Sequence, residues 1–337
     1  MGPAQHSIVQ IHPTRRCNLR CLHCYSSSGP DQRDQLDASV FERAITDAGA
    51  EGYRVASFSG GEPVLYKELP RLLRHAKSCG MHTTVTSNGM LLDEKRLAGL
   101  AGVTDVLALS LDGVPESHNK MRASQRAFET MAERLPAVRA SRIPFGFIFT
   151  LTQYNVNEME WAAAFAFRQG AGLFQVHPLE EVGRAAVELT GARPDEVEAA
   201  YAYLEVERIR QQYAGKMAVQ FDLVHAKVLR DHPERFFDRG DATGRALGDL
   251  VSPLVIEADG RVVPFGYGFA RGYALGSLQK ATLLELAAKW RANGYRDLQS
   301  LCHKTFVDAS QERELPILNW WEKLGEHANT SEVRTAG

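Results

Sequence analysis

YRVASFSGGEPVLYKELPRLLRHAKSCGMHTTVTSNG, residues 53–89, contains the pattern that decides the fold. Residues 53–61 read as a strand that ends in glycines, and residues 69–80 carry apolar side chains at helical spacing. Residues 82–89 return to a strand pattern. A strand, a helix and a second strand at this spacing predict two parallel strands joined by a right-handed crossover.

The same unit recurs through about the first 180 residues, which indicates an α/β fold. Further strands are predicted at 7–14, 105–113, 144–151 and 172–181, and further helices at 37–52 (behind an Asp cap), 93–102, 127–141 and 157–170. Six strands are too few for a closed eightfold barrel. We therefore expect a partial (β/α)6 TIM-like barrel or an open sheet, with ligands beyond the carboxyl ends of the strands.

The pattern changes after residue 184, where an appended α+β unit is predicted. Its expected elements are a helix at 194–215, a strand at 217–224, a loop at 231–250, a hairpin at 251–268 and a helix at 282–294. Asp259-Gly260 is a preferred pair for the tight turn of that hairpin. We divide the chain into a core domain, residues 1–185, and an extension, residues 186–337.

Composition excludes several classes of protein. The chain has 337 residues, of which 44% are hydrophobic, and a formal net charge of -2, so nothing favours nucleic acid or an anionic membrane as a partner. No apolar run reaches the roughly 18 residues of a membrane span. The start, MGPAQHSIVQ, does not read as a signal peptide, so we expect a soluble cytoplasmic protein.

Three of the five cysteines, Cys17, Cys21 and Cys24, follow the first predicted strand with the spacing C-x3-C-x2-C. Thiolates at such spacing suit zinc or an iron–sulfur centre. A zinc site usually takes four ligands, and His12 or His23 is available as the fourth. A [4Fe–4S] cluster held by only three cysteines leaves one iron open, which implies chemistry at the cluster rather than electron transfer alone.

The cysteine spacing resembles the CxxxCxΦC signature of the radical S-adenosylmethionine (radical SAM) superfamily, with His23 at the position that is usually aromatic. Other segments at the ends of predicted strands resemble motifs of the same superfamily. They are SGGEP (59–63), TSNG (86–89), SLDG (110–113) with the HNKMR that follows it, and QVHPLEEVGRA (175–185). The resemblance covers roughly residues 7–185.

This resemblance implies one [4Fe–4S] cluster on Cys17, Cys21 and Cys24, with S-adenosylmethionine (SAM) on the open iron. The residues that it assigns to the cofactor site are His23, Gly60, Gly61, Glu62, Pro63, Ser87, Asn88, Ser110, Asp112, Arg122 and His177. Glycines allow close backbone approach to SAM, and a guanidinium suits its carboxylate. For each of these residues a purely structural role, such as a turn or a buried hydrogen bond, stays open.

The resemblance also implies the reaction. An external donor of the flavodoxin or ferredoxin type supplies an electron, SAM is cleaved to a 5′-deoxyadenosyl radical, and that radical abstracts hydrogen from the substrate. The hairpin resembles the start of a SPASM or twitch extension, in which cysteines hold auxiliary clusters. Here Ser252 and Phe265 occupy the matching positions and only Cys302 lies downstream, so we expect a degenerate, cluster-free extension.

Extensions of this kind accompany several substrate classes in the family. We expect modification of a ribosomal peptide or a peptide-derived cofactor. The alternatives are a radical SAM enzyme that acts on a small molecule or a haem-type tetrapyrrole precursor, and, from another class, a non-catalytic metal-binding scaffold protein.

Overall fold

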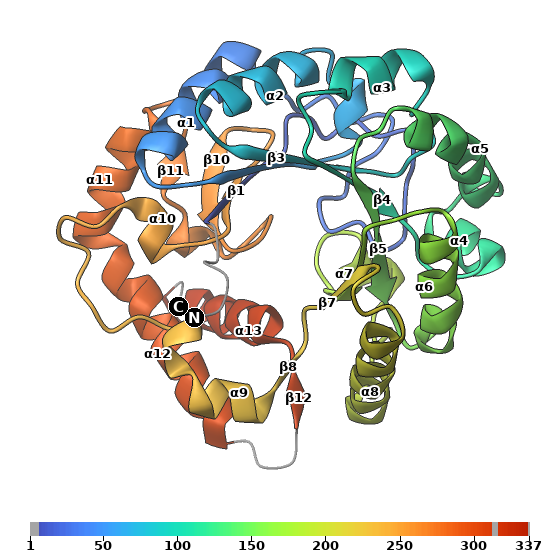
Figure 1. Ribbon diagram of the computed structural model, residues 1–337. Coiled ribbons are helices and arrows are strands. Elements are labelled where there is room, and N and C mark those ends of the chain that lie inside the picture. Colours follow the sequence, from blue (N-terminus) through green and yellow to red (C-terminus); the bar gives the residue numbers. More distant parts are fainter. Residues whose placement is uncertain (1–6, 312–315, 336–337) are drawn as a thin grey trace.

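The computed structural model describes residues 7–311 and 316–335, and a curved ten-stranded sheet forms its centre (Figure 1). Across the sheet the order is β11-β10-β9-β1-β2-β3-β4-β5-β6-β7. The strands are β1 (Ile8–Ile11), β2 (Val55–Phe58), β3 (His82–Ser87), β4 (Val106–Ser110), β5 (Phe145–Leu151), β6 (Leu173–Pro178), β7 (Ala218–Phe221), β9 (Leu254–Ile256), β10 (Arg261–Pro264) and β11 (Gly276–Ser277). From β9 to β7 all neighbours are parallel, which confirms the partial barrel.

Helices follow the first five strands and lie along the outside of the curve (Figure 1). They are α1 (Ala38–Ala50), α2 (Leu69–Ser78), α3 (Glu94–Leu100), α4 (Pro115–Met121), α5 (Ala127–Ala140) and α6 (Met159–Arg168). All but the short α4 were predicted, to within a few residues at each end. The expected Asp cap is wrong in one respect, because Asp37 precedes α1 but its side chain makes no capping hydrogen bond.

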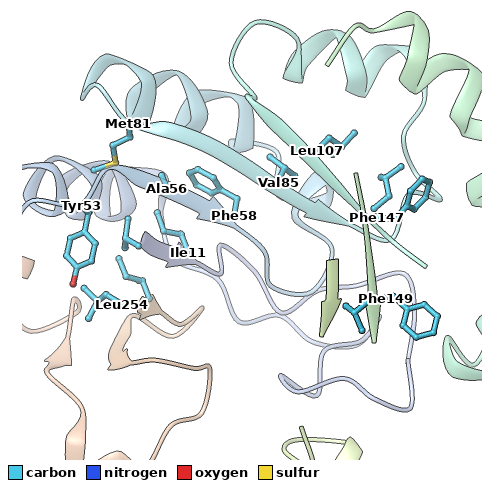
Figure 2. Close-up of a cluster of buried hydrophobic side chains, with 14 of the residues drawn as sticks. Ile11, Tyr53, Ala56, Phe58, Met81, Val85, Leu107, Phe147, Phe149 and Leu254 are labelled. Atoms are coloured by element: carbon cyan, nitrogen blue, oxygen red, sulfur yellow. The ribbon is translucent and has the colours of Figure 1, made fainter. Parts of the chain in front are cut away.

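The main core lies between the sheet and these helices, and Figure 2 shows part of it. Alternate strand residues, such as Ile11, Phe58 and Phe147, are fully buried there with apolar side chains of the helices. Successive residues of a strand point to opposite faces of the sheet. The other set of strand residues therefore lines the inner, concave face of the sheet.

The C-terminal hairpin is part of the main sheet rather than a separate unit. Strand β9 pairs in parallel with β1, and β10 returns antiparallel to β9. Gly260 has a φ of +84° in the predicted turn, where a residue with a side chain would be strained. The sheet thus joins strands from both sides of residue 185, and the proposed division into two domains stays a prediction.

The rest of the extension is mostly helical. Its further elements are α7 (Ala185–Glu188), α8 (Glu196–Gln212), α9 (Ala226–Asp231), α10 (Leu247–Leu250), α11 (Leu283–Asn293), α12 (Tyr295–Gln311), α13 (Trp320–Thr335) and the paired strands β8 (Val224–His225) and β12 (Ile317–Leu318). The sequence did not predict α12 or α13, and the expected loop at 231–250 contains the short α10. None of the helices in the described ranges is both long and apolar enough to cross a bilayer.

Candidate active site

The three clustered cysteines lie in the loop that joins β1 to α1, at the carboxyl edge of the sheet. Cys17 and Cys21 are buried, and the partly exposed Cys24 packs against them. Backbone N–H groups donate to two of the sulfurs, from Leu19 to Cys17 Sγ at 3.4 Å and from Ser28 to Cys24 Sγ at 3.3 Å. Burial, followed by the charge of the neighbouring Glu62, raises the pKa of Cys17 to about 12. Without metal this thiol stays protonated, so iron must displace its proton.

This donor set suits an iron–sulfur cluster. The three cysteines lie together in one loop, and thiolates are the usual ligands of an iron–sulfur cluster. Soft sulfur ligands that accept N–H hydrogen bonds are typical of such clusters.

Gly60 and Gly61 make room for the cysteine loop. A Cβ on Gly60 would lie 2.7 Å from the carbonyl oxygen of Thr14, and one on Gly61 would lie 2.3 Å from that of Arg16. The N–H of Gly61 donates to Thr14 O at 2.8 Å, which joins the two backbones. Both glycines are therefore needed for the packing of this loop, whether or not they also approach SAM.

Glu62 joins the ends of β2 and β3. It is fully buried, and its carboxylate accepts from Ser87 Oγ at 2.9 Å, from the N–H of Asn88 at 2.9 Å and from the N–H of Val64 at 3.4 Å. Burial raises the pKa of Glu62 to about 7 despite these donors. Asn88 Nδ2 in turn donates to Asn18 Oδ1 at 2.8 Å, so the network reaches the cysteine loop.

A second polar network forms around Asp112, at the end of β4. Arg122 Nε donates to Asp112 Oδ2 at 2.6 Å, and Arg122 Nη1 lies 3.8 Å from Cys21 Sγ. Burial raises the pKa of Asp112, but Arg122 and the imidazoles of His23 and His118 together outweigh it and hold that pKa below its usual range. Arg122 is itself buried, so it is not a solvated surface residue.

The structure thus gathers the strand-end motifs at the same edge of the sheet as the three thiols, and the comparison with known families shows to which family the chain belongs. The sequence pattern of the radical SAM superfamily matches residues 11–166, which include the cysteine loop and both polar networks. The chain belongs to the radical SAM superfamily. It is a radical SAM enzyme, so the alternative of a non-catalytic scaffold is wrong. Membership in this superfamily implies a [4Fe–4S] cluster and SAM.

Radical SAM enzymes with different substrates resemble this chain. Fe-coproporphyrin III synthase of Methanosarcina barkeri is 26% identical over 305 residues, which cover 83% of this chain and 73% of that protein. PqqA peptide cyclase of Xanthomonas campestris pv. campestris is 26% identical over 223 residues, 63% of this chain but only 57% of the cyclase. The solved structure of anSMEcpe with bound AdoMet and Cp18Cys peptide superposes with a TM-score of 0.66 at 17% identity over 98% of each chain, which shows a shared fold.

The remaining residues that the radical SAM resemblance assigned also lie at the carboxyl edge. Pro63 begins a 3-10 turn (Pro63–Leu65) behind Glu62, and Ser110 is buried at the end of β4. His177, on β6, is partly exposed, and its Nδ1 lies 2.7 Å from Asp222 Oδ2. Although burial lowers it, the hydrogen bond with Asp222 raises the pKa of His177 to about 9. Contacts of these residues with SAM stay predictions.

Two residues of this radical SAM enzyme were missed. Asp222 follows β7 and bonds to His177, and Arg184 donates to the carbonyl oxygens of Cys21 and Ser28 in the cysteine loop. For Arg184 a signal existed, since it stands in the GRA segment that the resemblance had already singled out. Nothing local marks Asp222, because its partner is 45 residues away.

Proposed function

We propose that this radical SAM enzyme holds one [4Fe–4S] cluster on Cys17, Cys21 and Cys24 and acts on a ribosomal peptide or a peptide-derived substrate. When bound, the cluster and SAM supply the 5′-deoxyadenosyl radical. The protein's own residues hold these cofactors, exclude water from them and orient the substrate. A flavodoxin- or ferredoxin-type donor is proposed as the source of electrons.

The proposal of a peptide substrate rests on the side chains of the inner face of the sheet. Among its partly exposed strand residues, those able to form hydrogen bonds are Gln10, Ser57, Thr84, Thr86, Thr150, Gln175 and His177. The apolar ones are Ile148 and, at the amino ends of their strands, Ile8, Val55, Val106 and Leu173. Closed barrels of this type fill the interior with bulky branched side chains instead. A neutral, hydrogen-bonding surface complements the amide groups of a peptide.

A tetrapyrrole precursor is the second candidate, because Fe-coproporphyrin III synthase is the relative that matches over 83% of this chain. Such a macrocycle carries several carboxylates, which proteins usually bind with Arg or Lys. Neither residue type occurs in β1 to β6, whose side chains form the inner face. This observation favours the peptide.

The extension supports a single cluster. Ser252 Oγ accepts a hydrogen bond from the N–H of Ile8 at 3.0 Å, and the ring of Phe265 packs against Phe269 and Trp321 at centroid distances of 5.5 and 5.2 Å. Both positions that match cysteines in relatives are therefore used for hydrogen bonding and packing. The number of clusters in the protein stays part of the proposal.

Anaerobic reconstitution tests the proposed cofactors. The protein should bind about four irons per chain and should release 5′-deoxyadenosine from SAM under a strong reductant. Tight zinc binding without SAM cleavage would refute the cofactor assignment, and about eight irons per chain would refute the single cluster.

The two substrate classes can be separated with the same reconstituted enzyme. A short peptide encoded beside the gene and an iron coproporphyrin are each incubated with SAM and reductant. The molecular masses of the products are then measured by mass spectrometry. A mass change in the peptide alone supports our proposal, whereas loss of mass from the porphyrin alone establishes the second candidate.

A further inference from the structure

The turn after β6 holds the cysteine loop through one arginine. Arg184 Nη1 donates to the carbonyl oxygen of Cys21 at 2.7 Å, and Nη2 donates to that of Ser28 at 2.7 Å. The backbone N–H of Arg184 donates to the carbonyl oxygen of Cys24 at 2.9 Å. The planar guanidinium presents these donors in a fixed geometry, so it fixes the spacing of the carbonyl groups that it binds.

Gly183, the residue before this arginine, allows the turn to pack closely against the cysteine loop. Gly183 has a φ of +61°, and a Cβ there would lie 2.1 Å from the carbonyl oxygen of Tyr25 and 2.5 Å from its carbonyl carbon. Real side chains do not approach backbone so closely. Any other residue at position 183 would therefore push the turn and the cysteine loop apart.

The guanidinium of Arg184 is committed to the backbone of the cysteine loop. In the described part of the chain no Asp or Glu lies within ion-pair distance of it, and its hydrogen-bond acceptors are the main-chain carbonyls named above. The side chain and the backbone N–H of Arg184 therefore hold the same loop.

We propose that Gly183 and Arg184 are positioning residues for the iron–sulfur cluster. They fix the backbone of residues 21–28 so that two of the three thiols keep their spacing while iron is bound. They also connect this loop to β6, which carries His177 on the inner face. The proposal rests on the assignment of the three clustered cysteines as ligands.

The test compares full-length wild type, R184M, R184K and G183A after anaerobic reconstitution. The matched control is R139M, because Arg139 donates to Gln169 on an exposed surface of the molecule. We measure the iron content, the rate of iron loss to a chelator and the electron paramagnetic resonance spectrum of the reduced cluster. Loss of a residue that supports metal ligands typically weakens metal binding about 10–100-fold, so R184M and G183A should lose iron faster by about that factor.

The conservative variant separates charge from geometry. R184K keeps the charge but cannot bridge two carbonyl groups with a planar fork, so we expect an intermediate rate of iron loss and an altered spectrum. Circular dichroism of the iron-free proteins checks the fold. If R184M does not fold, the rates of iron loss from R184K and G183A test the proposal.

Wild-type rates and spectra in the folded Arg184 and Gly183 variants would overturn the inference and leave the proposed function intact. If the wild type itself takes up no cluster, the proposed function fails instead. The two failures are therefore distinguishable.

Discussion

At the carboxyl edge of the sheet, both ring nitrogens of His12 and Nδ1 of His23 are buried without a hydrogen-bond partner in the described part of the chain. Such atoms also occur elsewhere, at Thr104 just before β4 and at Trp290 and Asn319 in the extension, and each of them costs stability. The two imidazoles differ from these because both belong to the loop that carries the three clustered cysteines. At the amino edge, by contrast, the N–H of Ile8 is paired with Ser252 Oγ.

The cysteines of the two edges differ in the same way. Cys17, Cys21 and Cys24 pack together, whereas at the amino edge Cys302 lines a cavity of about 870 Å³ together with Phe265 and aromatic side chains of the extension. Burial raises the pKa of Cys302 to about 12, and no second thiol lines this cavity among the described residues. We therefore treat the carboxyl edge as the proposed ligand edge and the amino edge, where Cys302 is buried against the extension, as the packing edge.

Substitution of a clustered cysteine is the strongest way to break this comparison. Cys24→Ala should remove the cluster and abolish formation of 5′-deoxyadenosine from SAM, because two thiolates cannot replace three. Since Cys24 is partly exposed, the iron-free variant should unfold at nearly the wild-type temperature. Iron analysis and the SAM cleavage assay measure the effect.

Cys79→Ala is the matched control, because Cys79 ends α2 away from the clustered cysteines. This variant should keep the iron content of the wild type. A full cluster in Cys24→Ala would show that the carboxyl edge does not use its thiols in the proposed way.

The next largest effect is expected at Glu62. In Glu62→Gln an amide NH2 replaces one carboxylate oxygen and faces a donor, so one hydrogen bond is lost and a buried group is left unpaired. This should lower the free energy of unfolding by about 1–3 kcal/mol, measured by urea denaturation of the iron-free protein. Glu42→Gln, which alters only a surface ion pair with Arg71, should cost less than about 1 kcal/mol. Equal losses in both variants would contradict the bridging role of Glu62.

The two edges also differ in how far the sequence predicts them. Motifs at the carboxyl edge lie within a few residues of a strand end, and parallel strands bring all those ends to one side, so the sequence places Glu62 and Asp112 beside the cysteines. The partners inside the networks were not predicted, because Arg184 and Cys21 are 163 residues apart. Local patterns do not encode such contacts.

At the amino edge, most of what the sequence missed depends on tertiary packing. The helices α12 and α13 pack on each other and on α9 or the hairpin, and no motif marks their ends. The extension was expected as an appended unit because the strand and helix pattern changes after residue 184. The pairing of β9 with β1, which makes the hairpin part of the main sheet, leaves no mark in that pattern. The absence of the auxiliary-cluster cysteines, in contrast, was readable directly from Ser252 and Phe265.

The dependence of stability on pH sharpens the comparison at the carboxyl edge. The pKa of His177 is raised to about 9 in the folded protein by Asp222, so this pair stabilises the fold fully below the ordinary histidine pKa near 6.5 and loses that effect as the pH rises to about 9. Because both side chains are partly exposed, we expect a loss of no more than about 1 kcal/mol. Asp222→Asn should flatten this fall in the free energy of unfolding between pH 6.5 and 9, measured by urea denaturation across that range.

Asp231→Asn is the control for this pH series, because its partner is the exposed Lys227 on α9. Its pH dependence should follow that of the wild type. If Asp222→Asn and the wild type show the same slope between pH 6.5 and 9, the His177–Asp222 pair does not form in solution.

An effect of similar size is expected at the amino edge, from Cys302→Ala. The thiol is buried against the extension, so its loss should cost about 1 kcal/mol of unfolding free energy and leave the iron content and SAM cleavage unchanged. The two cysteine variants should therefore have opposite effects. Cys24→Ala should lose iron and keep its stability, whereas Cys302→Ala should keep iron and lose some stability. A drop in iron content in Cys302→Ala would mean that the amino edge binds iron as well, and the division of the sheet into a ligand edge and a packing edge would then be wrong.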